Sequence, residues 1–372
     1  MLESSMADQD ELREIVRDVL DEESSSETVR ALLDDPVGHD PALWSKLAAL
    51  GWCGIAVPEQ YGGAGCSFVE LGVVLSELGR HATPTPLLST VTLGIGAILL
   101  AGSPDQRAAW LPRLAAGEAK ATVAFSDAGG PGASSPGITV VPLRGAYRLR
   151  GRAAFVLDAH TAELLIVAAR HDSGARSLFL VDPAHAEIRV TPTVDQTRRL
   201  CDVVLDDVEV PVDAALGTVG EAGPVITGLL NRLAAGLACD SAGGADRLTE
   251  LTAEYARTRT QFGRPIGTFQ AVKHRCAVMA VDTEVAKMTA AHAVARFASD
   301  PSGDAEAVSI AALQCNDGYA RVAAAALQMH GGIGFTWEHD THLFLKRARL
   351  NQVLAGDAAW HRRRLAAALL TA

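Results

Sequence analysis

The sequence lacks the features that mark several protein classes. Its six cysteines are scattered without Cys-x-x-Cys spacing, so neither a structural zinc site nor a disulfide framework is expected. The formal net charge is −11, and no long stripe of lysine and arginine is present. This balance argues against an electrostatic footprint for nucleic acid. A Gly-x-Ser-x-Gly elbow, a P-loop and the paired carboxylates of glycosidases are missing too.

Long hydrophobic runs are also missing. The longest apolar stretch, from Ser89 to Gly102, is too short and too rich in glycine to cross a bilayer, and it predicts a buried helix. The N-terminal sequence MLESSMADQDELREIVRDVL is acidic and has no basic region followed by an apolar core, so no secretion signal is expected. We therefore expect a cytoplasmic protein with reduced thiols and no membrane partner.

What the chain does contain is a globular composition over a considerable length. It has 372 residues, of which 48% are hydrophobic and 21% are charged. Such a chain can bury a large core, and its length predicts one large multi-layer unit or two to three subdomains.

The hydrophobic pattern changes twice along the chain. Apolar residues recur at helical spacing from residue 1 to about 120, alternate as in short strands from 121 to 215, and return to helical spacing from 216 to 372. The predicted fold class is α+β, with a helical domain (1–120), a central β domain (121–215) and a C-terminal helical bundle (216–372).

Two glycine-containing turns interrupt the C-terminal helices. They read QFGRPIGTFQ, from Gln261 to Gln270, and HGGIGFTWEHD, from His330 to Asp340. Glycines beside polar or basic residues allow backbone N–H groups to approach a phosphate or another anion. Turns between helices also contain glycine and proline for geometry alone, so the turns by themselves leave both interpretations open.

Three blocks of sequence, taken in order, point to a family. They are LGWCGIAVPEQYGGAG (50–65), EYARTRTQFGRPIGTFQAVKHR (254–275) and LQMHGGIGFTWEHDTHLFLKRAR (327–349). Together with the central β domain, they resemble the acyl-CoA dehydrogenase family over nearly the whole chain. The resemblance implies a helical N-terminal domain, a β-barrel-like domain and a four-helix bundle. It also implies tetramers with FAD at the subunit interfaces, acyl-CoA substrates and electron-transfer flavoprotein as a partner.

In this family the FAD site has two halves from two different subunits. The half that is lent to the neighbour uses an arginine three residues before Phe-Gly, a glutamine eight residues after that phenylalanine, and a Gln-x-x-Gly-Gly turn. A guanidinium offers a fork of donors to pyrophosphate oxygens, and glycines admit close backbone N–H groups. All of these residues are present in the sequence: Arg259, Phe262, Gln270, Gln328, Gly331 and Gly332.

The other half of the family's FAD site does not match. Where relatives read Thr-Glu-Pro-x-x-Gly-Ser-Asp, this chain reads SDAGGPGAS from Ser126 to Ser134. The following strand, which carries Trp-x-Thr or Trp-x-Ser in the family, reads Phe155, Val156, Leu157 here. A leucine side chain cannot donate a hydrogen bond to a flavin nitrogen.

The family's catalytic glutamate is also missing. Tyr-Glu-Gly-Thr is replaced by Leu-Ala-Gly-Asp, so Ala355 stands at the position of the base that removes the α proton. Members with the base on an early helix use Glu-Arg, which corresponds to Asn231-Arg232 here. Asp357 and Asp240 are the candidate replacements, and both are expected to cap or solvate helix surfaces instead. We therefore assign no catalytic residue.

The retained and lost halves together predict a subunit without its own active site. Such a chain resembles the non-catalytic member of heteromeric α2β2 acyl-CoA dehydrogenases, which are known in bacteria that degrade sterol side chains. It would lend FAD-binding residues to a sister subunit that carries the glutamate and most of the acyl-CoA pocket. Loss of the base is expected to leave a larger or differently shaped pocket at the β domain.

Two other interpretations remain open at this point. One is an autonomous flavoenzyme of the same fold, a dehydrogenase with a relocated base or a relative of flavin monooxygenases; Leu157 and Asp357 argue against it. The other is a flavin-free structural homologue, against which Arg259, Gln270 and Gln328 argue. A metal site is not expected, because the residues that could suggest one have no open three-ligand spacing. They are Glu338, His339, Asp340 and His342.

Overall fold

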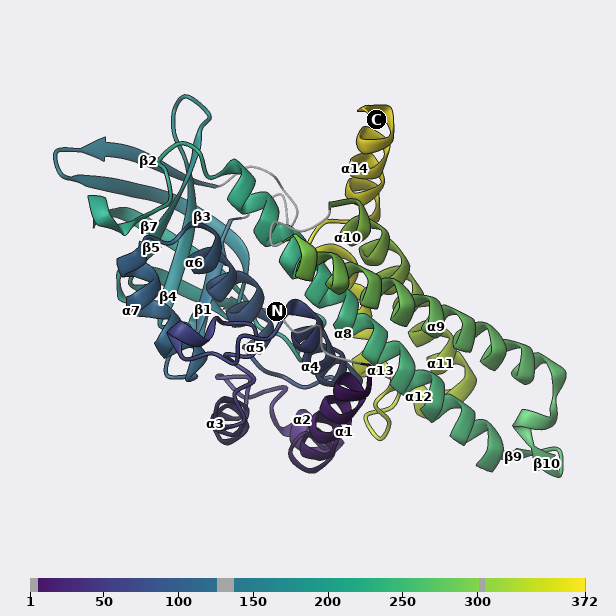
Figure 1. The fold of residues 1–372 in the computed structure, drawn as a ribbon. Coiled ribbons are helices and arrows are strands. Elements are labelled where there is room, and N and C mark those ends of the chain that lie inside the picture. The colour runs from purple at the N-terminus through teal and green to yellow at the C-terminus, as the bar shows by residue number, and fades with distance from the viewer. Residues whose placement is uncertain (1–5, 126–136, 301–304, 372) are drawn as a thin grey trace.

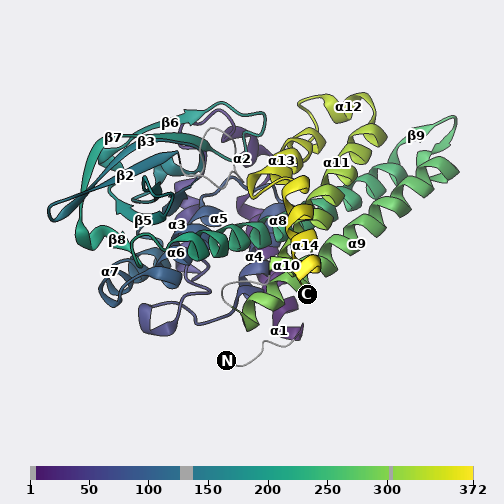
Figure 2. The ribbon, with the colours of Figure 1, turned by 90° about the horizontal axis from the view of Figure 1, so that it is seen from above.

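The computed structural model describes residues 6–125, 137–300 and 305–371. Helices from the first third of the chain pack between a twisted sheet and a bundle of long C-terminal helices (Figures 1 and 2). The sheet lies at one end of the molecule and the bundle extends to the other end. The predicted order of helices, sheet and helices is confirmed. The exact domain boundaries stay a prediction.

Short helices with clear start signals make up the N-terminal part. α4 begins with a capping box in which Ser67 and Glu70 satisfy each other's backbone N–H groups, and Ser103 and Gln106 do the same for α7. The elements are α1 (Met6–Glu23), α2 (Ser26–Ala31), α3 (Pro41–Ala49), η1 (Glu59–Tyr61), α4 (Phe68–Arg80), α5 (Leu87–Ser89), η2 (Thr90–Gly94), α6 (Ile95–Ala101) and α7 (Pro104–Ala115).

The apolar stretch from Ser89 to Gly102 is helical and mostly buried, as its composition predicts. A π-helical turn, η2, joins α5 to α6 in its middle. Within the residues that the structure describes, no helix is both long enough and apolar enough to cross a membrane.

The central sheet has eight strands in the order β6-β7-β3-β2-β4-β5-β8, with β1 paired to β4. β1 and β2 run parallel to β4, and the other neighbours are antiparallel. The strands are β1 (Ala121–Ala124), β2 (Ile138–Leu143), β3 (Ala146–Leu157), β4 (Leu164–Arg170), β5 (Arg176–Val181), β6 (Glu187–Thr191), β7 (Leu200–Pro211) and β8 (Ala215–Leu216).

A bulge redirects the last residues of β3. The register with β7 shifts between Ala153 and Val156, and Phe155 in the bulge has a positive φ of 58°. An extra residue in one strand bends the strand and re-aims the side chains that follow. Val156 still packs inside the sheet domain, whereas Leu157 belongs to the core of the helices.

Two long helices carry the C-terminal bundle to the far end of the molecule. α8 and α9 run side by side and are joined by a hairpin at their tip (Figures 1 and 2). The elements are α8 (Gly223–Thr258), β9 (Thr260–Gln261), β10 (Arg264–Pro265), α9 (Gln270–Ser299), α10 (Ala305–Ala311), η7 (Ala312–Asn316), α11 (Asp317–His330), α12 (Gly332–Phe335), α13 (Thr341–Leu354) and α14 (Ala358–Thr371).

Glycines let α8 cross α4 at backbone contact. A Cβ on Gly243 would lie 1.8 Å from the carbonyl oxygen of Ser76, and a Cβ on Gly79 would lie 2.0 Å from that of Asp240. Such distances are far inside van der Waals contact, so only glycine fits at either position. The crossing fixes the N-terminal helices against the bundle.

We predict that Gly243→Ala destabilises the protein. The added methyl group must push α4 away from α8, and overpacking of this kind costs about 1–3 kcal/mol or more. Urea unfolding followed by circular dichroism measures the change. Gly223→Ala is the matched control, because a Cβ there meets nothing within 4 Å and alanine favours the helix. Equal stability of the two variants would contradict the close-crossing argument.

Candidate functional site

The first turn predicted to hold a cofactor is a tight two-residue hairpin. β9 pairs with β10, and the loop residues Phe262 and Gly263 both have positive φ, 54° and 75°. Two-residue hairpins require this geometry, which is strained for a phenylalanine by about 1–3 kcal/mol. Phe262 is also 91% exposed, so no burial within this chain offsets the strain. The turn holds an aromatic ring out into solvent.

Arg259 lies at the base of this hairpin, just beyond α8. Its N–H donates to the carbonyl of Tyr255 at 2.8 Å, and its carbonyl accepts from the N–H of Ile266 at 2.8 Å. The backbone is therefore fixed on both sides, while the guanidinium is exposed and forms no ion pair with any residue that the structure describes. Its exposed basic neighbours are Arg257, Arg264, Lys273, His274 and Arg275. This corner presents cationic donors to solvent.

The second turn follows α11. Gln328 is exposed in the last turn of that helix, and its carbonyl accepts the N–H of Gly331 at 3.2 Å. Gly331 has φ 62° and ψ −139°, a conformation that L-residues rarely adopt. A Cβ on Gly331 or Gly332 would meet no atom within 4 Å, so the space beside both glycines is open to another molecule.

Stacked rings join the two turns. The rings of Tyr255 and His330 stack with 4.4 Å between their centroids, and the ring of His339 lies 4.3 Å from that of His330. Tyr255 Oη also donates to the carbonyl of His330 at 3.4 Å. Tyr255 lies one helical turn before Arg259, and His330 lies directly before Gly331. The contact between Tyr255 and His330 therefore holds the turn at Arg259 against the turn at Gly331.

Sequence reasoning missed this stack. Tyr255 and His330 both lie inside the blocks that carry the family resemblance, and this was the only available signal. His330 is buried, its Nδ1 bonds the carbonyl of Ala326 at 2.8 Å, and burial lowers its pKa. The imidazole is thus neutral at pH 7 and can stack without a buried charge.

The predicted site residues therefore lie at one end of the bundle. The structure sets the segment with Arg259, Phe262 and Gln270 against the segment with Gln328, Gly331 and Gly332, and all six residues are exposed. None of them lines the small cavity around Leu157 or the cavity of about 240 Å³ between α2, α8 and α13. The geometry is that of an open surface and not of an enclosed pocket.

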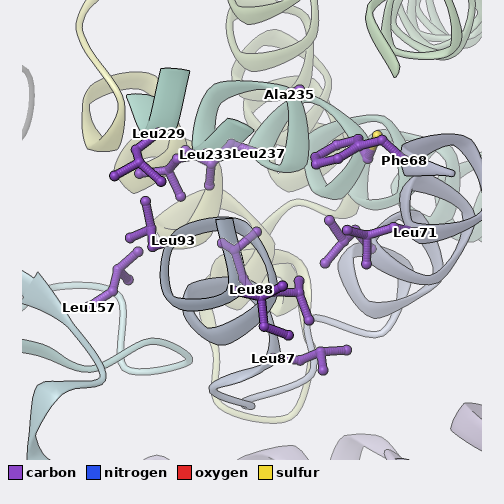
Figure 3. Packing of buried hydrophobic residues seen from close by; sticks show 14 of the residues in the cluster. Phe68, Leu71, Leu87, Leu88, Leu93, Leu157, Leu229, Leu233, Ala235 and Leu237 are labelled. Atoms are coloured by element: carbon purple, nitrogen blue, oxygen red, sulfur yellow. The ribbon is translucent and has the colours of Figure 1, made fainter. Parts of the chain in front are cut away.

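At the other half of the family's site, leucines fill the space. Leu157 points toward Leu93, across from Leu229 and Leu233 of α8 (Figure 3). The cavity that remains there is about 10 Å³, room for about one water molecule. Its lining is apolar and comprises Leu93, Val123, Phe125, Ala154, Phe155, Val156, Leu157, Leu233 and Leu354. Among the described residues the space beside Leu157 is small, and the expectation of a larger or differently shaped pocket stays a prediction. Ser126 to Ser134 lie outside the described residues.

The loop that replaces the family's glutamate carries alanine at the position of the base. Ala355 is buried, and the backbone turns at Gly356 with φ 106° against the ring of Trp360. Asp357 is exposed, and its carboxylate accepts the N–H of Trp360 at 2.7 Å. Asp357 therefore caps the start of α14, as predicted.

The expectation that Asp240 lies on a helix surface is wrong. Its carboxylate is buried and lies 2.9 Å from Nη2 of Arg198, and it accepts hydrogen bonds from Arg347 and Asn351. Burial alone would raise the pKa of Asp240, but the two guanidiniums outweigh it and lower the pKa to about 2. A carboxylate paired with two guanidiniums in this way is a weak proton acceptor near pH 7.

The early-helix position also holds no base. Asn231 is buried, and its Oδ1 accepts a hydrogen bond from Arg364 at 2.7 Å. Arg364 is thus partly buried, unlike its exposed neighbours Arg362 and Arg363. Arg232 is buried, with its guanidinium 5.1 Å from the ring of Phe68.

The acidic and histidine residues after the second turn serve packing. Asp340 accepts hydrogen bonds from Ser26 and Arg30 of α2. The ring of His339 contacts that of His330 at a tilt of 47°, and the ring of His342 lies edge-on to Trp337. No group of three or more His, Cys, Asp or Glu that could hold a metal ion occurs within residues 6–125, 137–300 and 305–371.

Comparison with known families agrees with this fold. Residues 6–118 match the model of the acyl-CoA dehydrogenase N-terminal domain, and residues 222–370 match that of the C-terminal domain. The acyl-CoA dehydrogenase IpdE2 of Mycolicibacterium smegmatis is 33% identical over 357 residues, covering 96% of this chain and 97% of the relative. The chain belongs to the acyl-CoA dehydrogenase family.

Two similar solved structures are complexes by their names. A variant of the Tcur3481–Tcur3483 steroid ACAD is 31% identical, with a TM-score of 0.89, and the match covers 98% of each chain. The ChsE4–ChsE5 complex of Mycobacterium tuberculosis is 28% identical, with a TM-score of 0.90 over 99% of this chain and 98% of that one. Heteromeric relatives are therefore similar to this chain along its whole length.

We predict that Asp240→Asn destabilises the fold by about 3–5 kcal/mol, because two buried guanidiniums lose their counter-ion. The folded-state pKa is depressed, so the stability from Asp240 is fully present above about pH 4 and is lost as the pH falls toward about 2. The free energy of unfolding, measured in urea from pH 7 downward, should differ between parent and variant by a constant amount and converge only in acid.

Asp282→Asn is the matched control. Asp282 pairs with Arg321 at 2.7 Å, but that guanidinium is 55% exposed, so the loss should be about 0–1 kcal/mol. If the two variants lost the same stability, the buried triad would have no special importance.

Proposed function

We propose that this chain is the non-catalytic subunit of a heteromeric, FAD-dependent acyl-CoA dehydrogenase. It lends Arg259, Phe262, Gln270, Gln328, Gly331 and Gly332 to the FAD of a sister subunit, which carries the catalytic glutamate. The observation that carries the proposal is an asymmetry within one chain: the residues of the family's lent half are all present and exposed, whereas the described part of the chain's own half is closely packed beside Leu157.

The chemistry of the lent half fits a dinucleotide. The guanidinium of Arg259 is exposed, forms no ion pair with any described residue, and can donate to pyrophosphate oxygens. The backbone at Gly331 and Gly332 leaves room for close approach. The exposed ring of Phe262 offers an apolar contact that would offset its strain once a neighbour covers it. FAD is the cofactor that the family resemblance implies for these residues.

The chain's own half does not fit a flavin ring. Cofactor pockets measure about 300–1,000 Å³, whereas the space beside Leu157 is about 10 Å³. Neither Leu157 nor Ala355 can donate or accept the required proton or hydrogen bond. We therefore assign no reaction step to this half of the chain.

The proposed reaction is α,β-dehydrogenation of an acyl-CoA thioester. The chemistry that FAD supplies when bound is acceptance of a hydride from the β carbon, with electron-transfer flavoprotein as the expected oxidant. In this scheme the present chain binds and orients the dinucleotide from across the interface. The similarity to a structure named a steroid ACAD supports a steroid side-chain CoA ester as the substrate class.

The first experiment is flavin stoichiometry and native mass, with the chain expressed alone and then with its sister subunit. We expect a colourless preparation alone and a yellow mixed tetramer with about half a flavin per chain. A stable yellow homotetramer with one flavin per chain would overturn the proposal.

We predict that Arg259→Ala in the mixed complex weakens flavin binding about 10–100-fold, since a charge-assisted hydrogen bond contributes about 1.5–3 kcal/mol. Flavin release on dilution, followed by fluorescence, measures the change, and native mass should stay that of the complex. Arg257→Ala is the matched control. Arg257 is an exposed arginine two residues from Arg259, and it already has a partner in this chain, Glu254 at 4.0 Å. If both variants lost the same flavin affinity, the effect would come from positive charge in general and not from a specific contact of Arg259.

We predict that His330→Ala weakens flavin binding even though His330 is expected to touch no flavin, because the stack on Tyr255 sets the two turns against each other. His330→Phe keeps a ring in the stack and should retain flavin. Affinity is compared well below the unfolding temperature of each variant. If the decrease in flavin affinity simply paralleled the decrease in stability in both variants, His330 would serve packing alone and would not position the two turns.

A further inference from the structure

A cavity of about 240 Å³ lies at the end of the second turn. Its other walls come from the connection between α1 and α2, the end of α4, the middle of α8 and the first residues of α13. Val29, Leu343 and Phe344 on its floor are buried, whereas Ser25 and Glu338 at its mouth are exposed. Close-packed interiors leave few voids larger than one water molecule, and this cavity has the volume of about eight. The fold keeps a space here that side chains could have filled.

One guanidinium beside this cavity has no close partner. Arg80 donates to Asp246 at 3.0 Å and also to Glu250. Arg247 lies 3.9 Å from the same Glu250, which is beyond hydrogen-bond distance, and no other carboxylate in the described part of the chain pairs with it. Arg80 has therefore taken the acceptor that Arg247 would use. Arg247 lines the cavity with its donors free among the described residues.

His339 supplies a second donor to the cavity. The backbone N–H of Thr341 donates to Nδ1 of His339 at 3.3 Å, and burial lowers the pKa of this imidazole. The ring is therefore neutral at pH 7 and carries its proton on Nε2. Within residues 6–125, 137–300 and 305–371 this Nε2–H has no acceptor. A guanidinium and an N–H donor at one cavity suit a carboxylate, which accepts charge-assisted hydrogen bonds on both oxygens.

Carboxylates at the mouth of the cavity restrict the ligand to one negative charge. Asp21 is hydrogen-bonded to His81 at 2.9 Å, and Asp340 is paired with Arg30. Glu338 also lines the cavity and is exposed. These three groups would repel a ligand with two negative charges, whereas a monoanion can bind at the free guanidinium on the α8 side.

We propose that this cavity binds a small monocarboxylate with an apolar body, about the size of benzoate. Arg247 and Nε2 of His339 hold the carboxylate, and the apolar body lies on the floor formed by Val29, Leu343 and Phe344. None of the six residues proposed to contact flavin lines this cavity, so the proposal holds whether or not the two turns bind FAD.

Calorimetric titration of the full-length chain with benzoate tests the ligand class, and we expect one benzoate per chain. Benzamide has the same shape without the charge and should bind at least about 10-fold more weakly, because charge-assisted hydrogen bonds are stronger than neutral ones. Phenyl phosphate carries a second charge near pH 7 and should also bind more weakly than benzoate. Equal binding of benzamide, tighter binding of phenyl phosphate, or no binding of benzoate would overturn the proposal.

Substitution of the free guanidinium tests the place of binding. Arg247→Gln should weaken benzoate binding about 10–100-fold and leave the fold intact, because the present pairing of Arg247 with Glu250 is loose and partly exposed. Arg257→Gln is the matched control. Arg257 lies on the same helix and has a similarly loose partner, Glu254 at 4.0 Å, but it does not line the cavity. Benzoate affinity in this control should equal that of the parent.

His339→Phe gives an independent arm. It keeps an aromatic ring against His330 but removes the Nε2–H, and it should weaken benzoate binding about 2–10-fold. Unchanged affinity in Arg247→Gln and His339→Phe would overturn the proposal. So would an equal loss in Arg247→Gln and Arg257→Gln, which would mean that benzoate responds to positive charge in general. The FAD-lending proposal survives each of these outcomes, since its readout is flavin affinity in Arg259→Ala.

Discussion

The pairing of Asp240 with two buried guanidiniums is the constraint on which the rest of the structure depends. Arg198 comes from the connection between β6 and β7, and Arg347 comes from α13 and also donates to the carbonyl of Thr83 after α4. One carboxylate on α8 thus holds the sheet, the N-terminal helices and the bundle in one arrangement. Because α8 continues from there to the hairpin at Arg259, the position of the proposed site residues depends on the same group. Burying three charges is costly, and their mutual pairing offsets that cost only if all three are present.

The architecture was predictable because each element carries a local signal. Capping boxes such as Ser67 with Glu70, alternation in the strands and helical spacing in the bundle are all readable within a few residues. The burial of Asp240 was not, since its partner Arg347 lies 107 positions away, and an aspartate within an alanine-rich helix gives no sign of what will cover it. The need for glycine at the α4–α8 crossing was also not predictable, because only the folded chain shows how closely the two helices approach.

The candidate site was predicted unevenly for the same reason. The family motifs predict Arg259, Gln270 and Gln328 as site residues, which stays a prediction. The alanine at position 355, where the family has glutamate, was evident from the sequence. The ring stack of Tyr255 on His330 needs two segments to meet, and the filling of the other half needs the bulge at Phe155 to turn Leu157 toward α8. The sequence shows that Leu157 cannot form the hydrogen bond that the family's Thr or Ser would form. Only the packing shows that Leu157 also occupies the space beside α8.

That packing has a consequence for how the protein can change over generations. Leu157, Leu233 and Leu354 come from three different elements and support one another in a single apolar cluster. Replacing any one of them by a polar residue would bury an unsatisfied group, and shortening any one would leave a cavity, each at a cost of about 2–5 kcal/mol before any new function is gained. A single substitution in this cluster therefore costs stability before it opens any space. A pocket at this place would require several of the side chains to change together.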